Sequence, residues 1–522
     1  MQLPAKIGIG CGVTFLVILI FGWMAFPSLL KNMIKKNVAL KEGGDIRTMW
    51  TKVPFPIDFK VYMFNVTNAR DVSNGDSPVL DEIGPFFFEE WKEKVNMSDN
   101  EADDTVSYNP KTRFVFSPEN SGKLTMDELI TIPHPFVASM VLAVNREKPA
   151  MLTLLNKALN VIFSKPESLF ITATVREILF DGLLINCSVT DFGAKAVCSQ
   201  IKTQAKDLDR VGEDGFLFSF FGMKNKTLEG RFKVKRGIKD SHDLGRVLEY
   251  EDKKQMDIWG SKECNQYHGT DSTIFPPFLK REEGLWSYAP DLCRSLGAYY
   301  TGSTTYDNIP VDIYKADLGD QTANKEDKCF CATPTTCLKK GVMDLTKCVG
   351  APIMVSLPHF YDCDESYQSM VRGLHPNENE HGIKILFESM TGTPVAARKR
   401  LQFSLPIEPI QKVSFMKTLP EALLPIMWVE EGLELNSTFT HQLDATLFRT
   451  MRIMKVVKWL ILSLSLVGMG VSAFFHFHKR NKFTINPNVA AAIPKTFGAS
   501  AKDDQRKSSV ISSINGNNVD RF

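Results

Sequence analysis

Two apolar stretches decide the fold: IGIGCGVTFLVILIFGWMAF at residues 7–26 and VVKWLILSLSLVGMGVSAFF at residues 456–475. A helix rises about 1.5 Å per residue, so each stretch is long enough to cross a hydrocarbon core of roughly 30 Å. The second stretch contains Lys458, whose ammonium can reach the lipid head groups, beside Trp459 in an interfacial position. The sequence therefore predicts one membrane-spanning helix near each end of the chain.

Each stretch has an alternative interpretation. A cleaved signal peptide has an apolar region of typically about 7–15 residues and a small-residue cleavage site, whereas the first stretch is longer and runs on into WMAFP. A buried helix of a soluble core shows one apolar stripe, whereas apolar residues surround the second stretch. We therefore expect five segments along the chain: cytoplasmic residues 1–6, a span at 7–28, an extracellular domain at 29–455, a span at 456–477 and a cytoplasmic tail at 478–522.

The composition predicts a large folded domain between the spans. Of 522 residues, 43% are hydrophobic and 23% are charged, which is enough apolar material for a substantial core. The net charge of +2 gives no basic surface for nucleic acid. Residues 58–65, 231–235 and 401–405 alternate with period two, which predicts half-buried strands.

Cysteines and glycosylation acceptors decide the orientation, because lysine and arginine flank both sides of both spans. Cys11 lies in the first span, and the other nine cysteines lie between the spans. The Asn-x-Ser/Thr acceptors lie there too: Asn65, Asn96, Asn186, Asn225 and Asn436. Both features are typical of an oxidising extracellular compartment, so we expect both termini to be cytoplasmic.

No catalytic or metal site is predicted. The chain has no Gly-x-Ser-x-Gly elbow, Walker loop or His-Glu-x-x-His motif. Cys329, Cys331 and Cys337 are close in sequence, but the C-x2-C pairs or histidines of a structural zinc site are missing, which favours disulfides. HPNENEH at residues 375–381 contains a proline and two asparagines, which predict a turn with a structural role. We expect a non-enzymatic protein without a cofactor.

Three further patterns leave questions open. Apolar residues recur at helical spacing within residues 125–182, at Met151, Leu152, Leu154, Leu155, Ala158, Leu159 and Ile162. They predict either a core helix or a lipid-contact surface. Gly8-x3-Gly12 and Gly468-x3-Ser472 are small-residue faces that let membrane helices approach, unless they are tolerated lipid-facing residues. The tail at 479–522 is expected to be disordered, with Ser508 and Ser509 as candidate phosphorylation sites.

An ordered set of motifs makes the chain resemble a known family. The motifs are GTDSTIFPPF at 269–278, DLCRS at 291–295, CFC at 329–331, GVMDLTKC at 341–348, SLPHF at 356–360 and GLHPNENEH at 373–381. Together they resemble the class B scavenger receptor and fatty-acid translocase family over nearly the whole chain, and most closely its insect sensory-neuron branch, as in moths. The resemblance implies two transmembrane helices flanking a large, mixed, mainly β ectodomain. That domain would have an antiparallel β-barrel-like core, an apical helical bundle and a hydrophobic tunnel.

The resemblance also implies site residues. It selects three disulfides, namely Cys264 with Cys329, Cys293 with Cys348, and Cys331 with Cys337. It says nothing of Cys187, Cys198 and Cys363, of which the first two can pair across a short loop and leave Cys363 free and buried. Lys165 corresponds to apical lysines that contact ligands in relatives. With Met151, Leu155, Leu159 and Ile162 it forms the expected ligand-contact set.

By the same resemblance, the function is that of an olfactory lipid receptor. Such a protein takes a fatty-derived pheromone or other lipid and delivers it to an odorant receptor complex in the plasma membrane of sensory neuron dendrites. The alternative is a scavenger or protein-binding receptor of the same family, for lipoprotein, cell-surface or lysosomal cargo. The sequence leaves the ligand and a homo-oligomeric state open.

Overall fold

The structure is a computed structural model that describes residues 3–204, 208–333 and 335–482. The chain forms two compact units, one from residues 1–22 with 457–522 and one from residues 23–456. The expectations for the tail beyond residue 482, including Ser508 and Ser509, lie outside the described residues.

The first unit contains most of the apolar part of two long helices. Helix α1 (Leu3–Ile20) continues through a π-helical turn, η1 (Phe21–Ala25), into α2 (Phe26–Val38). Helix α13 (Arg449–Lys482) follows α12 (Ser437–Leu443) and the turn η10 (Asp444–Phe448). The continuous helices Leu3–Val38 and Ser437–His478 are each long and apolar enough to cross a membrane. Both predicted spans are therefore helices that can cross a bilayer.

Small residues form the contact between α1 and α13. A Cβ added at Gly8 would lie 2.6 Å from Ser472 Oγ, and one at Gly468 would lie 2.5 Å from Cys11 Sγ. The Ser472 hydroxyl donates a hydrogen bond to the Pro4 carbonyl. Both small-residue faces predicted from the sequence thus lie in the interface between the helices, where only a residue without a large side chain fits.

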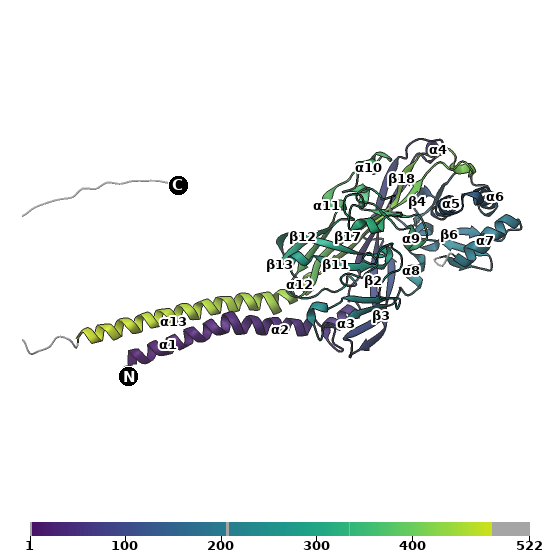
Figure 1. Cartoon of the computed structure of the whole chain (residues 1–522). Coiled ribbons are helices and arrows are strands. Elements are labelled where there is room, and N and C mark those ends of the chain that lie inside the picture. The colour runs from purple at the N-terminus through teal and green to yellow at the C-terminus, as the bar shows by residue number, and fades with distance from the viewer. Residues whose placement is uncertain (1–2, 205–207, 334, 483–522) are drawn as a thin grey trace, which may run out of the picture. The chain divides into compact units, whose positions relative to one another are not determined.

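The second unit is built on one large antiparallel sheet (Figure 1). The strands lie in the order β10-β9-β3-β2-β1-β18-β17-β16-β13-β12-β11, and the short pair β14 and β15 attaches through β17. The bounds are β1 Ile57–Val66, β2 Leu80–Asn100, β3 Thr105–Phe116, β9 Phe232–Lys235, β10 Val247–Tyr250, β11 Leu285–Ala289, β12 Arg294–Tyr306, β13 Ile309–Ala316, β14 Met343–Asp344, β15 Met354–Ser356, β16 Ile383–Glu388, β17 Thr393–Ile407 and β18 Ala422–Glu434. The sheet is nearly closed, so the barrel-like core is confirmed. The three predicted strands correspond to parts of β1, β9 and β17.

Alternation along the central strands separates two faces. Val61 on β1 lies opposite Phe86 on β2 and Val429 on β18, and all three side chains are buried. We call this side the inner face. On the other face Tyr62 stacks on Trp428 with ring centroids 3.8 Å apart. The apolar period of two therefore builds the core on one side of the sheet.

Helices gather at the end of this unit opposite α2 and α12, and we call this end the apex (Figure 1). It contains α5 (Pro135–Glu147), α6 (Leu152–Ile162) and α7 (Phe192–Gln204). Two small sheets accompany them, with strands β4 Leu129–Pro133, β5 Phe170–Thr174, β6 Leu183–Asn186, β7 Asp209–Val211 and β8 Gly215–Phe218. The expected apical bundle is present. The remaining short helices are α3 Asp45–Thr51, α4 Ala69–Val72, α8 Gly222–Lys226, α9 Thr346–Val349, α10 Glu365–Ser369 and α11 Glu378–His381.

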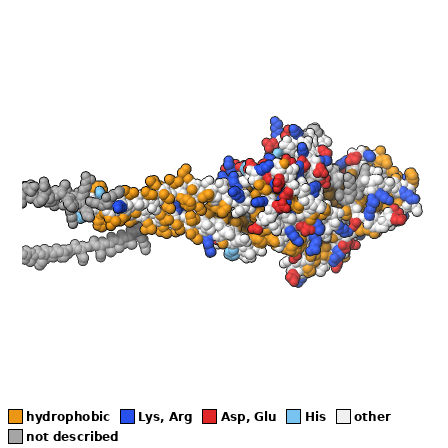
Figure 2. All heavy atoms as spheres, turned by 90° about the horizontal axis from the view of Figure 1, so that it is seen from below, with side chains coloured by type: hydrophobic (Ala, Val, Ile, Leu, Met, Phe, Trp, Pro, Cys, Tyr) orange, Lys and Arg blue, Asp and Glu red, His pale blue; other side chains and the backbone are white. Residues whose placement is uncertain are grey.

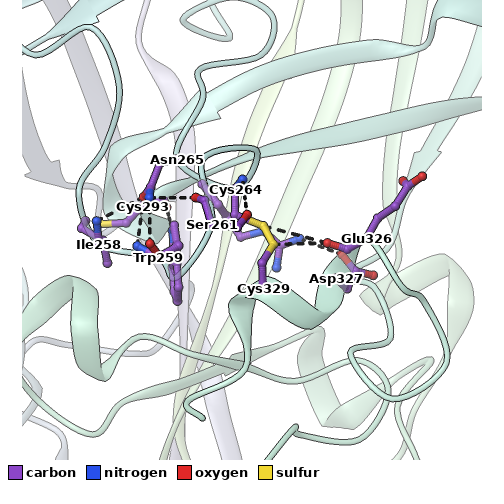
Figure 3. Close-up of a disulfide and its surroundings, with 10 residues drawn as sticks. Ile258, Trp259, Ser261, Cys264, Asn265, Cys293, Glu326, Asp327 and Cys329 are labelled. Carbon is purple, nitrogen blue, oxygen red and sulfur yellow. Dashed lines mark hydrogen bonds and ion pairs between the residues drawn. A yellow bond between two sulfur atoms is a disulfide. The ribbon is translucent and has the colours of Figure 1, made fainter. Parts of the chain in front are cut away.

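Disulfides fasten the loops around the sheet. The structure pairs Cys264 with Cys329, Cys293 with Cys348, and Cys331 with Cys337, the same pairs that the family resemblance implies. Figure 3 shows Cys264 and Cys329 beside Trp259, whose indole donates a 2.6 Å hydrogen bond to the Cys293 carbonyl.

The remaining cysteines of this unit lie in two places. Cys187 bonds Cys198 and so fastens α7 to the strand before it. Cys363 is unpaired, and burial raises the pKa of its thiol to about 12. Cys363 is half-buried rather than fully buried, and a thiol with so high a pKa carries almost no thiolate at neutral pH, so we expect it to react slowly.

Candidate ligand-binding site

A cavity of about 330 Å³ opens at the apex. The start of α5, the loop after α6 and strand β5 form most of its wall. Its lining residues are His134, Val137, Phe163, Pro166, Ser168, Leu169, Ile171, Thr172, Ala173, Glu177, Leu183, Leu184 and Phe415. Most of these side chains are apolar, and the volume is in the range of small-ligand pockets. A tunnel from this cavity through the unit stays a prediction.

His134 is the polar residue deepest in the wall of this cavity. Its carbonyl accepts the first helical hydrogen bond of α5, from Ala138, and its amide donates to the Leu169 carbonyl at 2.8 Å. The backbone therefore holds the imidazole in place, with its edge against Phe163 at 5.1 Å between centroids.

One nitrogen of the His134 imidazole is buried without a polar partner. Its Nδ1 is buried and has no hydrogen-bond partner among the described residues. Burial lowers the pKa of His134 to about 4, so the ring is neutral at pH 7. A neutral imidazole offers one donor and one acceptor, and an unpaired buried atom is one that a ligand can satisfy.

The structure separates the predicted ligand-contact residues into two groups. Leu155, Leu159 and Ile162 are buried in the core beneath α6. Met151 is 46% exposed at the start of the helix. Lys165 is exposed in the turn after α6, where its amide donates to the Asn160 carbonyl. The buried stripe of α6 thus belongs to the core, and a ligand role for any of the five stays a prediction.

Sequence reasoning missed the residues that line the cavity. Phe163 and Pro166 flank Lys165 in sequence and reach the cavity, but neither continues the helical pattern of α6. His134 precedes Pro135 at the start of a helix, a position that no binding motif marks. Only the three-dimensional crossing of α5, the loop and β5 brings these residues together.

Part of the apex presents apolar side chains to solvent. Phe192, at the first position of α7, exposes 87% of its side chain. Leu154 on α6 lies close to the following residue of α7, since a Cβ at Gly193 would lie 2.9 Å from Leu154 Cδ1. Hydrophobic side chains are visible at this end in Figure 2. We call Phe192 and Leu154 the apical patch.

The histidine motif has the structural role expected of it. His381 Nδ1 accepts a hydrogen bond from the Asn377 amide at 2.9 Å, and His359 Nδ1 accepts one from His375 at 3.0 Å. The rings of His359 and His381 stack at 4.3 Å. No group of side chains in the described ranges could hold a metal ion. The motif pins a loop onto the outer face of the sheet.

Comparison with known proteins agrees with the fold. The CD36 family model matches residues 9–476. The chain belongs to the CD36 family. It is 45% identical to sensory neuron membrane protein 1 of Apis mellifera, over 92% of this chain and 93% of that protein. It is 43% identical to the protein of the same name in Anopheles gambiae, over 95% and 92%, and 45% identical to that of Manduca sexta, over 90% of each chain.

These matches confirm the resemblance inferred from the motifs, including its sensory-neuron branch. The relatives come from different genera at almost equal identity, so the comparisons do not single out moths. CD36 family membership and the two terminal apolar helices support a membrane lipid-binding receptor of the class B scavenger type. The names indicate receptor or transport proteins rather than enzymes.

Proposed function

We propose that this protein captures fatty-derived pheromones outside the cell and delivers them to odorant receptors in the plasma membrane of sensory neuron dendrites. In this proposal residues 29–455 are extracellular and both termini are cytoplasmic. The observation that carries the proposal is the apical cavity, whose lining residues are mostly apolar and include an imidazole with one buried nitrogen that has no partner among the described residues. Such a site suits a long hydrocarbon chain with a single polar group.

The free energies of burial and of hydrogen bonding show which part of the ligand contributes most to the affinity. A chain of about 14 methylenes gains on the order of 11 kcal/mol on full burial, at roughly 0.8 kcal/mol for each methylene. One hydrogen bond to a head group adds about 0.5–1.5 kcal/mol net. Affinity should therefore rise with chain length, while head groups on chains of equal length should differ by about tenfold or less.

Ligand titration on the full-length protein in lipid nanodiscs tests this proposal. We expect the affinity for straight-chain alcohols of 10, 12 and 14 carbons to rise with length. Thr172→Trp places an indole at an exposed position of the cavity lining and should weaken tetradecan-1-ol at least tenfold. Thr203→Trp, at an exposed position of α7 outside the lining, is the matched control. Affinity that ignores chain length, or equal binding by both variants, would contradict the proposal.

A protein-binding receptor is the second candidate, and the apical patch favours it. A phenylalanine exposed to 87% is costly in water and is typical of an interaction surface. Phe192→Ser should leave alcohol binding unchanged, because Phe192 is not in the cavity lining. If the variant nevertheless abolishes the response of cells that express an odorant receptor, the apex acts through a protein partner.

A further inference from the structure

Two helices leave the second unit at the end opposite the apex, and one hydrophobic cluster holds both of them. Ile34 and Val38 on α2 are buried in this cluster. Leu447 and Phe448, in the turn that leads into α13, are buried in the same cluster. The apolar side of each helix therefore packs on the unit, and the opposite side of each helix faces outward.

The outward side of both helices is basic. It carries lysine or arginine at six positions, which we call the basic collar: Lys31, Lys35, Lys36, Arg449, Arg452 and Lys455. Lys35 is half-buried, and the other five side chains are exposed. Lysine and arginine side chains are visible at this end of the unit in Figure 2. The sequence has no acidic residue within 1–41 or 445–502, so neither helix carries a charge that balances the collar.

Most of the collar has no anionic partner within the protein. Arg452 forms an ion pair with Asp444 at 2.5 Å. Lys31 Nζ lies 5.4 Å from the centroid of the Phe278 ring. The other four side chains form neither an ion pair nor a hydrogen bond within the described ranges of the chain. Four cations are therefore available to an anion from outside the protein.

The spacing within the collar makes its charges repel one another. Lys31 and Lys35 are four residues apart on α2, so they lie on the same side of that helix. Arg449, Arg452 and Lys455 follow one another at intervals of three residues on α13, which also places neighbours side by side. Like charges at these spacings destabilise a helix, and an anion bound between them would relieve the repulsion.

Helix geometry places the collar at the level of lipid head groups. Both helices are continuous with the predicted spans, which end at residue 28 and begin at residue 456. At about 1.5 Å per residue, the three members nearest the spans lie within about 6 Å of the hydrocarbon core, and the other three within about 12 Å. The head-group layer is roughly 5–7 Å thick on each side, and long basic side chains can reach into it from above.

Exposed apolar side chains lie among these cations. Leu29 and Met33 on α2 and Ile453 on α13 each expose half or more of their surface. A mixture of exposed apolar and basic residues suits the boundary between acyl chains and head groups, where each kind of side chain meets its own environment. The composition of this surface therefore fits a lipid better than it fits bulk water.

The orientation of the chain does not account for the collar. Lysine and arginine that orient a membrane protein are enriched in its cytoplasmic loops. In the proposed topology the collar lies on the opposite, extracellular side. A surplus of positive charge there needs another cause, and a phosphate within reach supplies one.

We propose that the basic collar binds the phosphate groups of acidic phospholipids in the surrounding leaflet. Its ammonium and guanidinium groups donate hydrogen bonds to the phosphate oxygens, while Leu29, Met33 and Ile453 contact the acyl chains. An acidic phospholipid fits better than phosphatidylcholine, because the trimethylammonium group of phosphatidylcholine competes with the collar for the phosphate. This proposal goes beyond ligand capture, since it concerns how the second unit is seated on the bilayer.

Native mass spectrometry of the full-length protein can count the phospholipids that stay bound. The protein is extracted in a nonionic detergent that contains equal amounts of phosphatidylglycerol and phosphatidylcholine. We expect the wild-type protein to retain phosphatidylglycerol over phosphatidylcholine by about tenfold or more. Raising the salt concentration should reduce this preference, because salt screens exposed charges.

Charge variants locate the binding site. The collar variant combines four substitutions that break no ion pair: Lys35→Gln, Lys36→Gln, Arg449→Gln and Lys455→Gln. The control variant removes the same charge from four exposed positions at the apex: Lys148→Gln, Lys157→Gln, Lys195→Gln and Lys202→Gln. The collar variant should lose the preference for phosphatidylglycerol, and the control variant should keep it. Each half of the collar variant, on α2 or on α13 alone, should give an intermediate value.

Two results would overturn the collar site: equal retention of both phospholipids by the wild-type protein, or the same preference in the collar and control variants. A heparin column provides a further test. If the collar variant loses heparin binding but keeps its lipid preference, the collar binds a sulfated polysaccharide and the proposal is wrong. Titration with tetradecan-1-ol, which tests the proposed function, should give equal affinities for the wild type and the collar variant. The two proposals can therefore fail independently.

Discussion

Two buried histidines each contribute to the pH dependence of the stability of the second unit. Burial is the largest cause that lowers the pKa of both His134 and His381 to about 4. In the unfolded chain each imidazole titrates near pH 6.5. Between these values the unfolded state binds more protons, so stability is fully present above pH 6.5 and is lost as the pH falls towards 4.

We therefore expect each of these histidines to lower the free energy of unfolding by up to about 2 kcal/mol between pH 7 and pH 5. Denaturant titrations at pH 7, 6 and 5 measure the effect. His134→Gln and His381→Gln should each make the pH dependence shallower. His268→Gln replaces an exposed histidine and should leave the pH dependence of the free energy of unfolding unchanged. A pH dependence that none of the three alters would contradict this assignment.

Lys165 is exposed, and its charge is screened by water. An ion pair with a ligand carboxylate there is worth about 1 kcal/mol at most. Lys165→Ala should therefore weaken myristate by about fivefold or less and leave tetradecan-1-ol unchanged. Lys148→Ala, beyond the C-terminal end of α5, is the control for a general loss of apical charge. A large loss for the alcohol would show that Lys165 has a structural role.

At the scale of single residues, the sequence predicts the role of a local motif better than it predicts which charged side chains are buried. The motif around His375 and His381 contains a turn-forming proline, and local chemistry was enough to assign it a structural role. Glu90 and Lys92 gave no signal, because charges on alternate positions of a strand look like a solvated face. Glu90 is nevertheless buried, because the pairing of β2 with distant strands places it on the inner face, which local sequence does not encode.

At the scale of elements, hydrophobic periodicity predicted which face of a strand or helix is buried. The alternation at residues 58–65 is the buried face of β1, and the helical spacing around Leu155 is the buried face of α6. The same spacing could not say whether α6 faces core or lipid, because both environments favour leucine. The pairing of α1 with α13 was predictable from Gly8 and Gly468, since small residues in an apolar helix serve close approach.

Glycine positions on α1 provide a matched test of the helix pair. A Cβ at Gly8 would collide with Ser472, whereas one at Gly10 would have nothing within 4 Å. Gly8→Leu should therefore separate α1 from α13, and Gly10→Leu should not. Gly468→Cys supplies the reporter, since a Cβ there would lie 3.5 Å from Cys11 Cβ, within disulfide range.

Mild oxidation of membranes should cross-link Cys11 to the new cysteine at position 468, which a gel detects as a change in mobility of the intact chain. The cross-link should form in the Gly10→Leu background and be lost in the Gly8→Leu background. Equal cross-linking in both would mean that Gly8 does not hold the helices together.

For the whole molecule, the acceptor asparagines provide a test of the proposed topology. Asn96, Asn186, Asn225 and Asn436 are exposed in the second unit. Asn65 differs, because it is half-buried within the long strand β1. The sequence motif treats all five alike, but a folded strand leaves the Asn65 side chain little room for a bulky glycan.

We expect glycans on the four exposed acceptors and none on Asn65. Glycosidase treatment of the protein from intact cells should lower its apparent mass. Single substitutions to Gln at the four exposed positions should each remove one step of mass, whereas Asn65→Gln should remove none. Because a glycan is added only on the luminal side, four occupied sites would place residues 96 to 436 outside the cytosol. The two spans would then return both ends of the chain to the cytosolic side. A C-terminal epitope that external protease removes from intact cells would refute this topology, even if every glycan were found where expected.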